Sequence, residues 1–251
     1  MYLYIYDTFL NQKKYFNLLN RIENRLADLE IKGKICRLNI LKNMKEVIED
    51  GIKQGVETIV AVGNDLTFSK IVNIIAELNI TLGMIPVTAS KIAQILGVPE
   101  GEKACDTLAQ RLTQKIDLGK INQQYFIDSA TINNPNVVLN FEKFQISPVA
   151  KDALVSICNL GFLTANQSIY KQRLSNPTDG LLEAVIAPLK NKFLMKKLDR
   201  QSIFPFKKIT IASKGEPVTI TIDQQAVFKT PVEVTVSPKK LKVIVGNKRL
   251  F

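Results

Sequence analysis

The sequence predicts an α/β domain with a parallel sheet, followed by an all-β domain that we expect to be a β-sandwich. Up to residue 114, apolar β-branched runs alternate with stretches that carry apolar residues at helical spacing, which is the pattern of βαβ units. From residue 115 onward, strand-like runs follow one another with turn residues between them. We therefore expect two domains, 1–114 and 115–251, with the last residues packing back on the first domain.

The first domain contains the most strongly marked strand of the chain. Thr58–Val62 is a continuous apolar, β-branched run, which is typical of a strand buried on both faces. A turn at Gly63-Asn64-Asp65 follows this strand and leads into a helix that we expect to reach Ile75. The other expected elements of this domain are strands at 2–6, 35–40 and 82–86 and helices at 16–29, 44–54 and 90–96.

The second domain is expected to consist of strands. Its turn signals include Asn133-Asn134-Pro135 and Lys214-Gly215-Glu216-Pro217, because Asn, Gly and Pro favour turn conformations. The expected strands are 115–118, 125–132, 137–141, 153–158, 182–186, 208–211, 218–222, 232–236 and 241–245.

The composition removes several classes of function. The chain has 251 residues and no histidine, which excludes Ser-His-Asp and Cys-His catalysis and histidine-ligated metals. Its 3 cysteines lack paired spacing, so we expect reduced thiols rather than disulfides or a zinc site. No apolar run reaches the roughly 18 residues that span a bilayer, and Asp7 stands where a signal peptide would stay apolar. We therefore expect a cytoplasmic protein.

The formal net charge of +11 favours anionic partners. Nucleotides, nucleic acids and anionic lipid surfaces all qualify, and a lysine-rich solvated surface without any partner is an equal alternative. Aromatic residues do not interleave with the basic ones as in a platform for single-stranded nucleic acid, so we expect no nucleic acid. A peripheral contact with an anionic membrane is expected to weaken with salt.

The segment Ile59–Thr67 runs from the buried strand through a small-residue turn into a helix. α/β proteins place ligands at the carboxyl ends of their strands, and the N-terminus of a helix offers N–H groups and a favourable dipole to phosphate. Thr67 is a candidate N-cap or phosphate ligand. The alternative is that Gly-Asn-Asp forms an ordinary turn without a ligand.

Several segments, in collinear order, resemble the diacylglycerol kinase catalytic-domain family, which has an NAD kinase-like fold. Gly63-Asn64-Asp65-Leu66-Thr67 aligns with the family's Gly-Gly-Asp-Gly-Thr motif, although two of the glycines are replaced. Ile85–Pro99 resembles the second nucleotide-site segment, with Ser90 in place of an asparagine and Lys91 in place of an aspartate. The opening strand lacks the family's Asn-Pro signature. The resemblance covers about residues 56–246 and continues through Lys115–Asn122, Ser156–Asn159, Asp179–Glu183, Ile220–Gln225, Thr230–Val234 and Ser237-Pro238.

The resemblance implies a lipid kinase of the bacterial type that transfers phosphate from ATP, with Mg²⁺, to a lipid hydroxyl. It implies that Asp223 and Gln225 occupy the catalytic segment and that Asp179 helps to hold a structural Mg²⁺. The expected partners are a nucleotide and a membrane lipid, and the oligomeric state stays open, with a homodimer among the candidates. The residues implied in nucleotide binding are Gly63, Asn64, Asp65, Thr67, Thr88, Ser90 and Lys91.

The substitutions in these motifs alter the implied chemistry. Leu66 crowds the phosphate cradle, whereas Asn64 is a mild change because asparagine tolerates a left-handed conformation. Lys91 removes an acceptor but adds a positive charge that can pair with phosphate. Gln225 replaces a glutamate that resembles a general base, and an amide cannot supply base catalysis worth about 10²–10⁴-fold. Asp223 is a weak substitute for this base. In the expected strand its side chain lies on the same face as Gln225, about 6–7 Å from it.

We therefore expect weak or absent lipid kinase activity. The alternative is a catalytically silent relative that binds a nucleotide, a lipid or a protein. A related fold that phosphorylates a soluble nucleotide cofactor would share the glycine-rich turn. The segments Ile220–Gln225 and Thr230–Val234 disfavour that third possibility, because they look like those of the lipid kinases.

Overall fold

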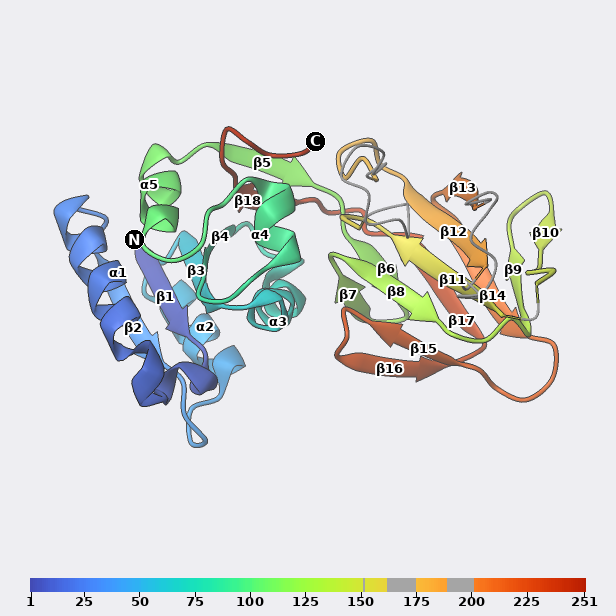
Figure 1. Ribbon diagram of the computed structural model, residues 1–251, viewed down its shortest axis with the longest axis horizontal. Coiled ribbons are helices and arrows are strands. Elements are labelled where there is room, and N and C mark those ends of the chain that lie inside the picture. The colour runs from blue at the N-terminus through green and yellow to red at the C-terminus, as the bar shows by residue number, and fades with distance from the viewer. Residues whose placement is uncertain (151, 162–174, 189–200) are drawn as a thin grey trace, which may run out of the picture. The chain divides into compact units, whose positions relative to one another are not determined.

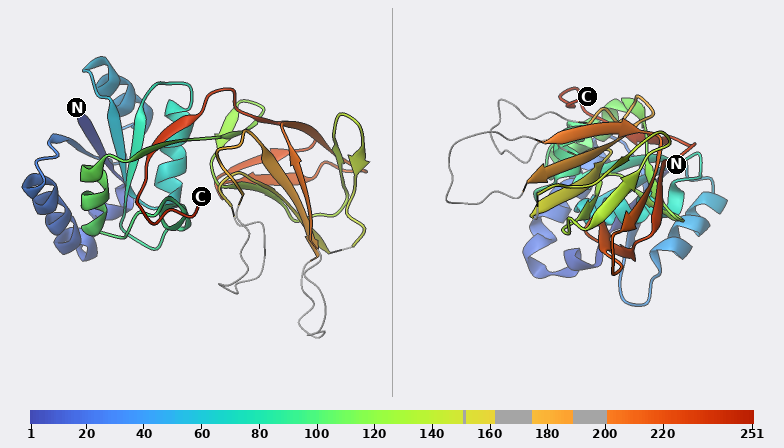
Figure 2. Two further views of the ribbon diagram at one scale, coloured as in Figure 1. Left: turned by 90° about the horizontal axis from the view of Figure 1, so that it is seen from above. Right: turned by 90° about the vertical axis from the view of Figure 1, so that its right-hand side faces the viewer.

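The computed structural model describes residues 1–150, 152–161, 175–188 and 201–251. The chain divides into two compact units (Figures 1 and 2). The first unit contains residues 1–116 together with 239–251, and the second contains residues 117–238. The chain therefore crosses from one unit to the other twice.

The first unit is built on a six-stranded sheet with the order β2-β1-β3-β4-β18-β5. Neighbouring strands run parallel from β2 to β18, and β5 pairs with β18 in the antiparallel direction. The strands of this sheet are β1 (Tyr2–Tyr6), β2 (Gly33–Arg37), β3 (Thr58–Gly63), β4 (Thr81–Pro86), β5 (Thr113–Ile116) and β18 (Leu241–Ile244).

Helices cover both faces of this sheet. Figures 1 and 2 show α1 and α5 on one face and α2 and α3 on the other. Because both faces are covered, every residue of β1 and β3 is buried, which explains their nearly continuous apolar sequences. The helices are α1 (Phe16–Asp28), α2 (Met44–Lys53), α3 (Asp65–Ile75), α4 (Lys91–Leu96) and α5 (Lys103–Gln110), with short 3₁₀ turns η1 (Thr8–Asn11) and η2 (Lys13–Tyr15).

The strand order creates a topological switch point between β1 and β3. From β1 the chain moves outward to β2 in one direction, and from β3 to β4 in the other. Connections that leave a parallel sheet in opposite directions open a crevice at the carboxyl ends of the two central strands, where open α/β sheets bind ligands. Asp7 follows β1, and Asn64 follows β3, at this edge of the sheet.

The second unit is a sandwich of two six-stranded sheets. One sheet has the order β10-β9-β14-β17-β6-β7 and the other β13-β12-β11-β8-β15-β16. Their inner faces share one apolar core, which includes Phe126 and Leu139 from the first sheet and Ile157 and Ile220 from the second. The strands are β6 (Gly119–Ile121), β7 (Gln124–Phe126), β8 (Ser129–Ile132), β9 (Val137–Asn140), β10 (Gln145–Ile146), β11 (Ala153–Cys158), β12 (Leu182–Pro188), β13 (Ser202–Phe206), β14 (Lys208–Ser213), β15 (Thr219–Ile222), β16 (Ala226–Lys229) and β17 (Val232–Val236).

The predicted fold class, α/β plus all-β, is confirmed, and the differences concern single elements. The strand expected at 35–40 ends at Arg37, and Ile40 is fully solvent-exposed. The run expected at 125–132 is two strands, because the chain turns between Phe126 and Ser129. Helix α5 was not expected, nor were the short strands β6, β10, β13 and β16. No helix in the described part of the chain is both long enough and apolar enough to cross a membrane.

Candidate functional site

The corner between β3 and α3 is a capped helix start. Asn64 is the N-cap, and its Oδ1 accepts a hydrogen bond of 3.0 Å from the backbone N–H of Thr67. In return, Thr67 Oγ1 accepts a 3.2 Å hydrogen bond from the N–H of Asn64, which completes a capping box. The expectation that Thr67 itself caps the helix was therefore wrong. Asn64 has a φ of −128°, so its tolerance for a left-handed conformation is not used here.

Gly63 is required at this corner for space. A Cβ atom at position 63 would lie 2.3 Å from Thr67 Oγ1, closer than any non-bonded contact allows. Gly63 is not among the residues with positive φ, so its conformation alone would admit other residues. The space left by the missing side chain is occupied by the Thr67 hydroxyl. The Thr67 side chain therefore lines this corner together with the backbone amides.

Asp7 joins the corner from the neighbouring strand. Asp7 is 9% exposed, and its Oδ2 accepts a 2.7 Å hydrogen bond from Thr67 Oγ1. Its Oδ1 accepts a 3.0 Å hydrogen bond from Thr8 Oγ1. A buried carboxylate thus spans the switch point between β1 and β3. Asp7 was missed as a site residue, and the signal that could have found it is a charged residue directly after a wholly apolar strand.

Asp65 connects α3 to the start of α4. Its Oδ1 accepts a hydrogen bond from the Ser90 hydroxyl, and its Oδ2 accepts one of 3.0 Å from the backbone N–H of Lys91. Ser90 is the N-cap of α4, because its Oγ accepts a 2.9 Å hydrogen bond from the N–H of Ala93. Asp65 therefore holds the second predicted segment against the first.

The predicted nucleotide-binding residues accordingly meet at one edge of the sheet. Gly63 and the segment after β4 are joined directly, since the N–H of Val87 donates to the Gly63 carbonyl at 2.8 Å. Thr88 lies in the bend that follows Val87 and is half-buried. Lys91, also half-buried, is the first residue of α4. The carboxyl edge of β3 and β4 thus carries all seven residues.

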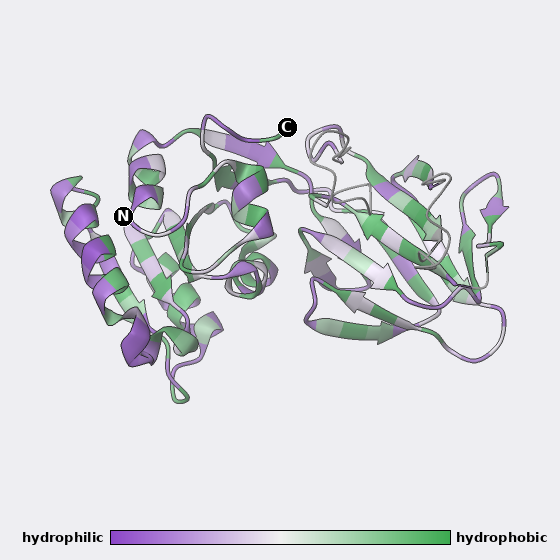
Figure 3. Ribbon diagram, in the orientation of Figure 1, coloured by the Kyte–Doolittle hydropathy of each residue, from purple (hydrophilic) through white to green (hydrophobic). Residues whose placement is uncertain are grey.

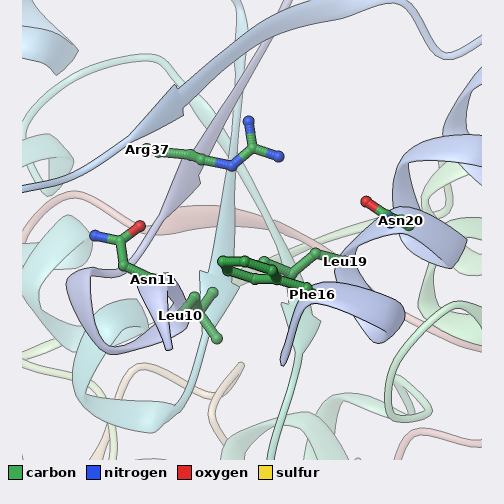
Figure 4. Close-up of a pocket in the computed structure, with 6 residues that line it drawn as sticks. All are labelled: Leu10, Asn11, Phe16, Leu19, Asn20 and Arg37. Atoms are coloured by element: carbon green, nitrogen blue, oxygen red, sulfur yellow. The ribbon is translucent and has the colours of Figure 1, made fainter. Parts of the chain in front are cut away.

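A hollow of about 330 Å³ lies between η1, the start of α1 and the end of β2, and Leu10 in its lining donates its backbone N–H to the Asp7 carbonyl at 3.1 Å. Figure 4 shows Arg37 extending over the hollow, with Phe16 and Leu19 on the opposite side. The guanidinium of Arg37 is paired with Glu23 and lies 5.2 Å from the centre of the Tyr6 ring. Burial, and then the charge of Glu23, raises the pKa of Tyr6, so its phenol stays neutral. The lining residues are Leu10, Asn11, Phe16, Leu19, Asn20 and Arg37.

In the second unit, Asp223 lies in the turn of the β15–β16 hairpin. Its φ is 45°, and that of Gln224 is 59°. The Asp223 carboxylate accepts three backbone hydrogen bonds, from the N–H groups of residues 127, 128 and 129, at 3.0, 3.0 and 3.1 Å. Asp223 therefore fastens the hairpin to the turn between β7 and β8. The expectation that Asp223 lies in a strand, on one face with Gln225, was wrong, because β15 ends at Ile222.

A family model described as the diacylglycerol kinase catalytic domain matches residues 2–121, which include the whole corner built around Gly63. Residues 2–121 are therefore similar to this catalytic domain. A diacylglycerol kinase of Bacillus subtilis (strain 168) is 42% identical over 79 residues, which are 30% of this chain and 26% of that protein. That match spans about a quarter of the relative's length.

Solved structures with the same fold cover both units. A diacylglycerol kinase from Bacillus anthracis str. Sterne superposes with a TM-score of 0.79 at 18% identity, over 99% of this chain and 98% of that one. An NAD kinase from Archaeoglobus fulgidus, solved in complex with ATP, superposes with a TM-score of 0.62 at 13% identity, over 99% and 95%. At these identities the likeness shows the fold alone, and it agrees with the predicted diacylglycerol kinase and NAD kinase architecture.

That Asp179 helps to hold a magnesium ion, as the likeness to diacylglycerol kinases implies, stays a prediction. Asp179 is exposed, and its Oδ1 accepts a 3.0 Å hydrogen bond from the N–H of Leu181. The buried Asp117 carboxylate accepts a 2.8 Å hydrogen bond from the N–H of Gly180 at the same turn. No group of three or more acidic or cysteine side chains that could hold a metal occurs among the described residues. The Asp117 and Asp179 carboxylates act as acceptors that order the turn.

Proposed function

We propose that the protein is an ATP-dependent lipid kinase of the diacylglycerol kinase type whose phosphoryl transfer is weak. The observation that carries this proposal is the family match over residues 2–121, which contains Asp7, the Gly63–Thr67 corner and the Ser90-Lys91 start of α4. The corner lies at the carboxyl edge of a parallel sheet beside its switch point, where this class of sheet binds ligands. ATP would supply the transferred phosphoryl group.

Each part of this edge has a role in the proposal. The N-terminus of α3 offers a positive dipole end to the phosphates, and Lys91 adds a point charge. Asp65 keeps Lys91 in place by accepting its backbone N–H. The half-exposed ring of Phe16 in the neighbouring hollow offers an apolar surface to the base. The Asp7 carboxylate opposes phosphate binding, because like charges repel, and this lowers the expected affinity.

The second reason for weak transfer is the missing base. Gln225 holds the position where the family has a glutamate, and an amide does not take up a proton at neutral pH. Both oxygens of the nearby Asp223 carboxylate already accept backbone hydrogen bonds, so it is a poor replacement. The same observation favours a second candidate, a relative that binds a nucleotide without transferring phosphate.

A thermal-unfolding titration with ATP and magnesium tests the nucleotide site. ATP at about 100 times its dissociation constant is expected to stabilise the protein by roughly 2.7 kcal/mol, because it binds only the folded state. Lys91→Ala should reduce this shift, since it removes the charge at the corner. Lys70→Ala is the matched control, because Lys70 is an exposed lysine further along α3. An unchanged melting temperature at millimolar ATP would rule out the proposed site.

Restoring the carboxylate tests the proposed cause of weak transfer. Gln225→Glu is expected to raise the rate of phosphate transfer from ATP to diacylglycerol by up to about 10²-fold, because it returns a general base. Gln224→Glu adds the same charge one residue away and serves as the control. Equal rates for Gln225→Glu and the unchanged protein, measured with radiolabelled ATP and mixed micelles, would show that a missing base is not what limits transfer.

The proposal includes peripheral contact with a membrane. A lipid hydroxyl is presented at a bilayer surface, and a chain with a formal net charge of +11 is attracted to anionic lipids.

A further inference from the structure

The loop between β2 and α2 exposes two adjacent aliphatic side chains. Ile40 is 101% exposed and Leu41 is 92% exposed, although most apolar side chains of this unit are buried. In Figure 3 the tip of this loop is coloured hydrophobic and projects away from the sheet and helices of the first unit. Apolar residues that remain together in water, outside the core, mark an interaction surface more often than single exposed ones do.

The loop has a defined shape. Asn39 Oδ1 accepts a 2.9 Å hydrogen bond from the N–H of Leu41, and the Asn39 carbonyl accepts one of 3.2 Å from the N–H of Lys42. On one side the loop is anchored by the buried Leu38, whose carbonyl accepts a 3.0 Å hydrogen bond from Asn11 Nδ2. On the other side Asn43 caps α2. The two side chains are therefore presented by an ordered turn, which keeps the entropy lost on binding small.

The charge beside the aliphatic pair is positive. Lys42 follows directly, is exposed, and has no carboxylate partner within ion-pair distance in the described part of the chain. Lys45 lies on the first turn of α2, with Glu49 3.8 Å from its Nζ. Glu46, an acidic residue, also lies on the first turn of α2. Aliphatic side chains next to an unpaired lysine suit the boundary between anionic headgroups and acyl chains.

The loop lies at the same edge of the sheet as the candidate site. The loop leaves the carboxyl end of β2, and β2, β1, β3 and β4 run parallel, so it lies at the same edge of the sheet as the Gly63 corner. If this loop inserted into a bilayer, the edge of the sheet that carries the Gly63 corner would therefore face the membrane.

The size of the exposed pair favours a bilayer over a protein partner. Two exposed side chains at the tip of a loop bury far less surface area than the ~800 Å² per partner of a stable protein interface. A bilayer has no such requirement.

We propose that residues 38–43 form a membrane-inserting loop, with Ile40 and Leu41 entering the acyl boundary of an anionic bilayer and Lys42 pairing with headgroup phosphates. This inference rests on the membrane contact in the proposed function and is independent of ATP binding and catalysis.

Sedimentation with vesicles of phosphatidylcholine and phosphatidylglycerol tests the loop. The double variant Ile40→Ser, Leu41→Ser is expected to lower the partition coefficient at least about tenfold, because two aliphatic side chains no longer leave water. Lys42→Ser should lower it by about fivefold, and less in high salt. Val149→Ser is the matched control, since Val149 is 99% exposed in the other unit. Because all these side chains are exposed, the variants should keep the unfolding midpoint of the unchanged protein.

The outcomes separate the two proposals. If the unchanged protein does not bind the vesicles, the membrane contact itself is wrong. If the unchanged protein binds and the double variant binds equally well, the protein contacts the membrane but not through this loop. The same conclusion follows if Val149→Ser lowers binding as much as the double variant does. If the double variant converts a dimer to a monomer in lipid-free sedimentation velocity, the loop serves self-association and the inference is overturned.

A fluorescent reporter measures insertion directly. The chain contains no tryptophan, so Leu41→Trp places a single indole at the loop tip. Its emission should shift to the blue on adding anionic vesicles, and lipids brominated in the acyl chain should quench it. Emission that stays at its aqueous wavelength while the protein sediments with vesicles would show that the tip remains in water.

Discussion

Replacing Asp223 with alanine is expected to destabilise the second unit by about 3 kcal/mol or more. Three backbone N–H groups lose a charged acceptor, and hydrogen bonds to charged groups contribute about 1.5–3 kcal/mol each when buried. Asp223 is only half-buried, which places each bond at the low end of that range. Alanine also tolerates a φ of 45° less well than aspartate does.

Urea unfolding of a short series separates the two contributions. Asp223→Asn keeps one side-chain oxygen and the tolerance for positive φ, so we expect a smaller loss of about 1–2 kcal/mol. Asp223→Gly relieves the backbone but keeps all three N–H groups unpaired, so it should lose less stability than the alanine variant and more than Asp223→Asn. A loss below about 1 kcal/mol for alanine would contradict the fastening role. Kinase assays on these variants are informative only at temperatures where each remains folded.

Gly63→Ala is expected to cost about 2 kcal/mol of stability and to disrupt the corner. The new methyl group would lie 2.3 Å from Thr67 Oγ1, so the hydroxyl must leave a position in which it bonds both the Asn64 N–H and Asp7. Overpacking of this kind costs about 1–3 kcal/mol, and loss of a capping interaction about 1 kcal/mol. The measurement is the free energy of unfolding from chemical denaturation.

A double-mutant cycle shows whether Thr67 causes this effect. In a Thr67→Ala background the clash with the hydroxyl is gone, so adding Gly63→Ala should cost about 1 kcal/mol less than it does alone. Gly215→Ala is the control, because a Cβ atom there would meet no other atom within 4 Å. Strictly additive losses would mean that the constraint at Gly63 comes from the backbone and not from Thr67.

Much of the fold was predictable because buried strands and amphipathic helices have recognisable local sequence patterns. The β-branched run of β3 and the helical spacing in α1 each reflect one element and its burial, and both were found. Ile40 misled the strand prediction because it continues the alternation of apolar and polar residues that starts in β2, after the chain has left the sheet. A sequence pattern shows that a residue is apolar. It does not show whether the side chain is buried in the protein core or in a lipid bilayer.

The site was predictable only in part, because some of its contacts join distant segments. Asp65 and Ser90 were found through motif likeness, whereas the role of Asp7 depends on β1 lying beside β3, which no local pattern states. The hairpin turn at Asp223 was hidden for a different reason. Positive φ normally selects glycine, and here it falls on Asp223 and Gln224, so no glycine marks the turn in the sequence.

The place of β18 has a consequence for how the molecule is made. Strand β18 lies between β4 and β5, and β5, at the end of the sheet, pairs with β18 alone among the described strands. During synthesis, residues 1–116 leave the ribosome long before residues 241–244 exist, and until then β4 presents an open edge. The sandwich can close first, since all of its strands have been translated by Val236. The first unit is synthesised first, but its sheet can be completed only after the second unit has been synthesised.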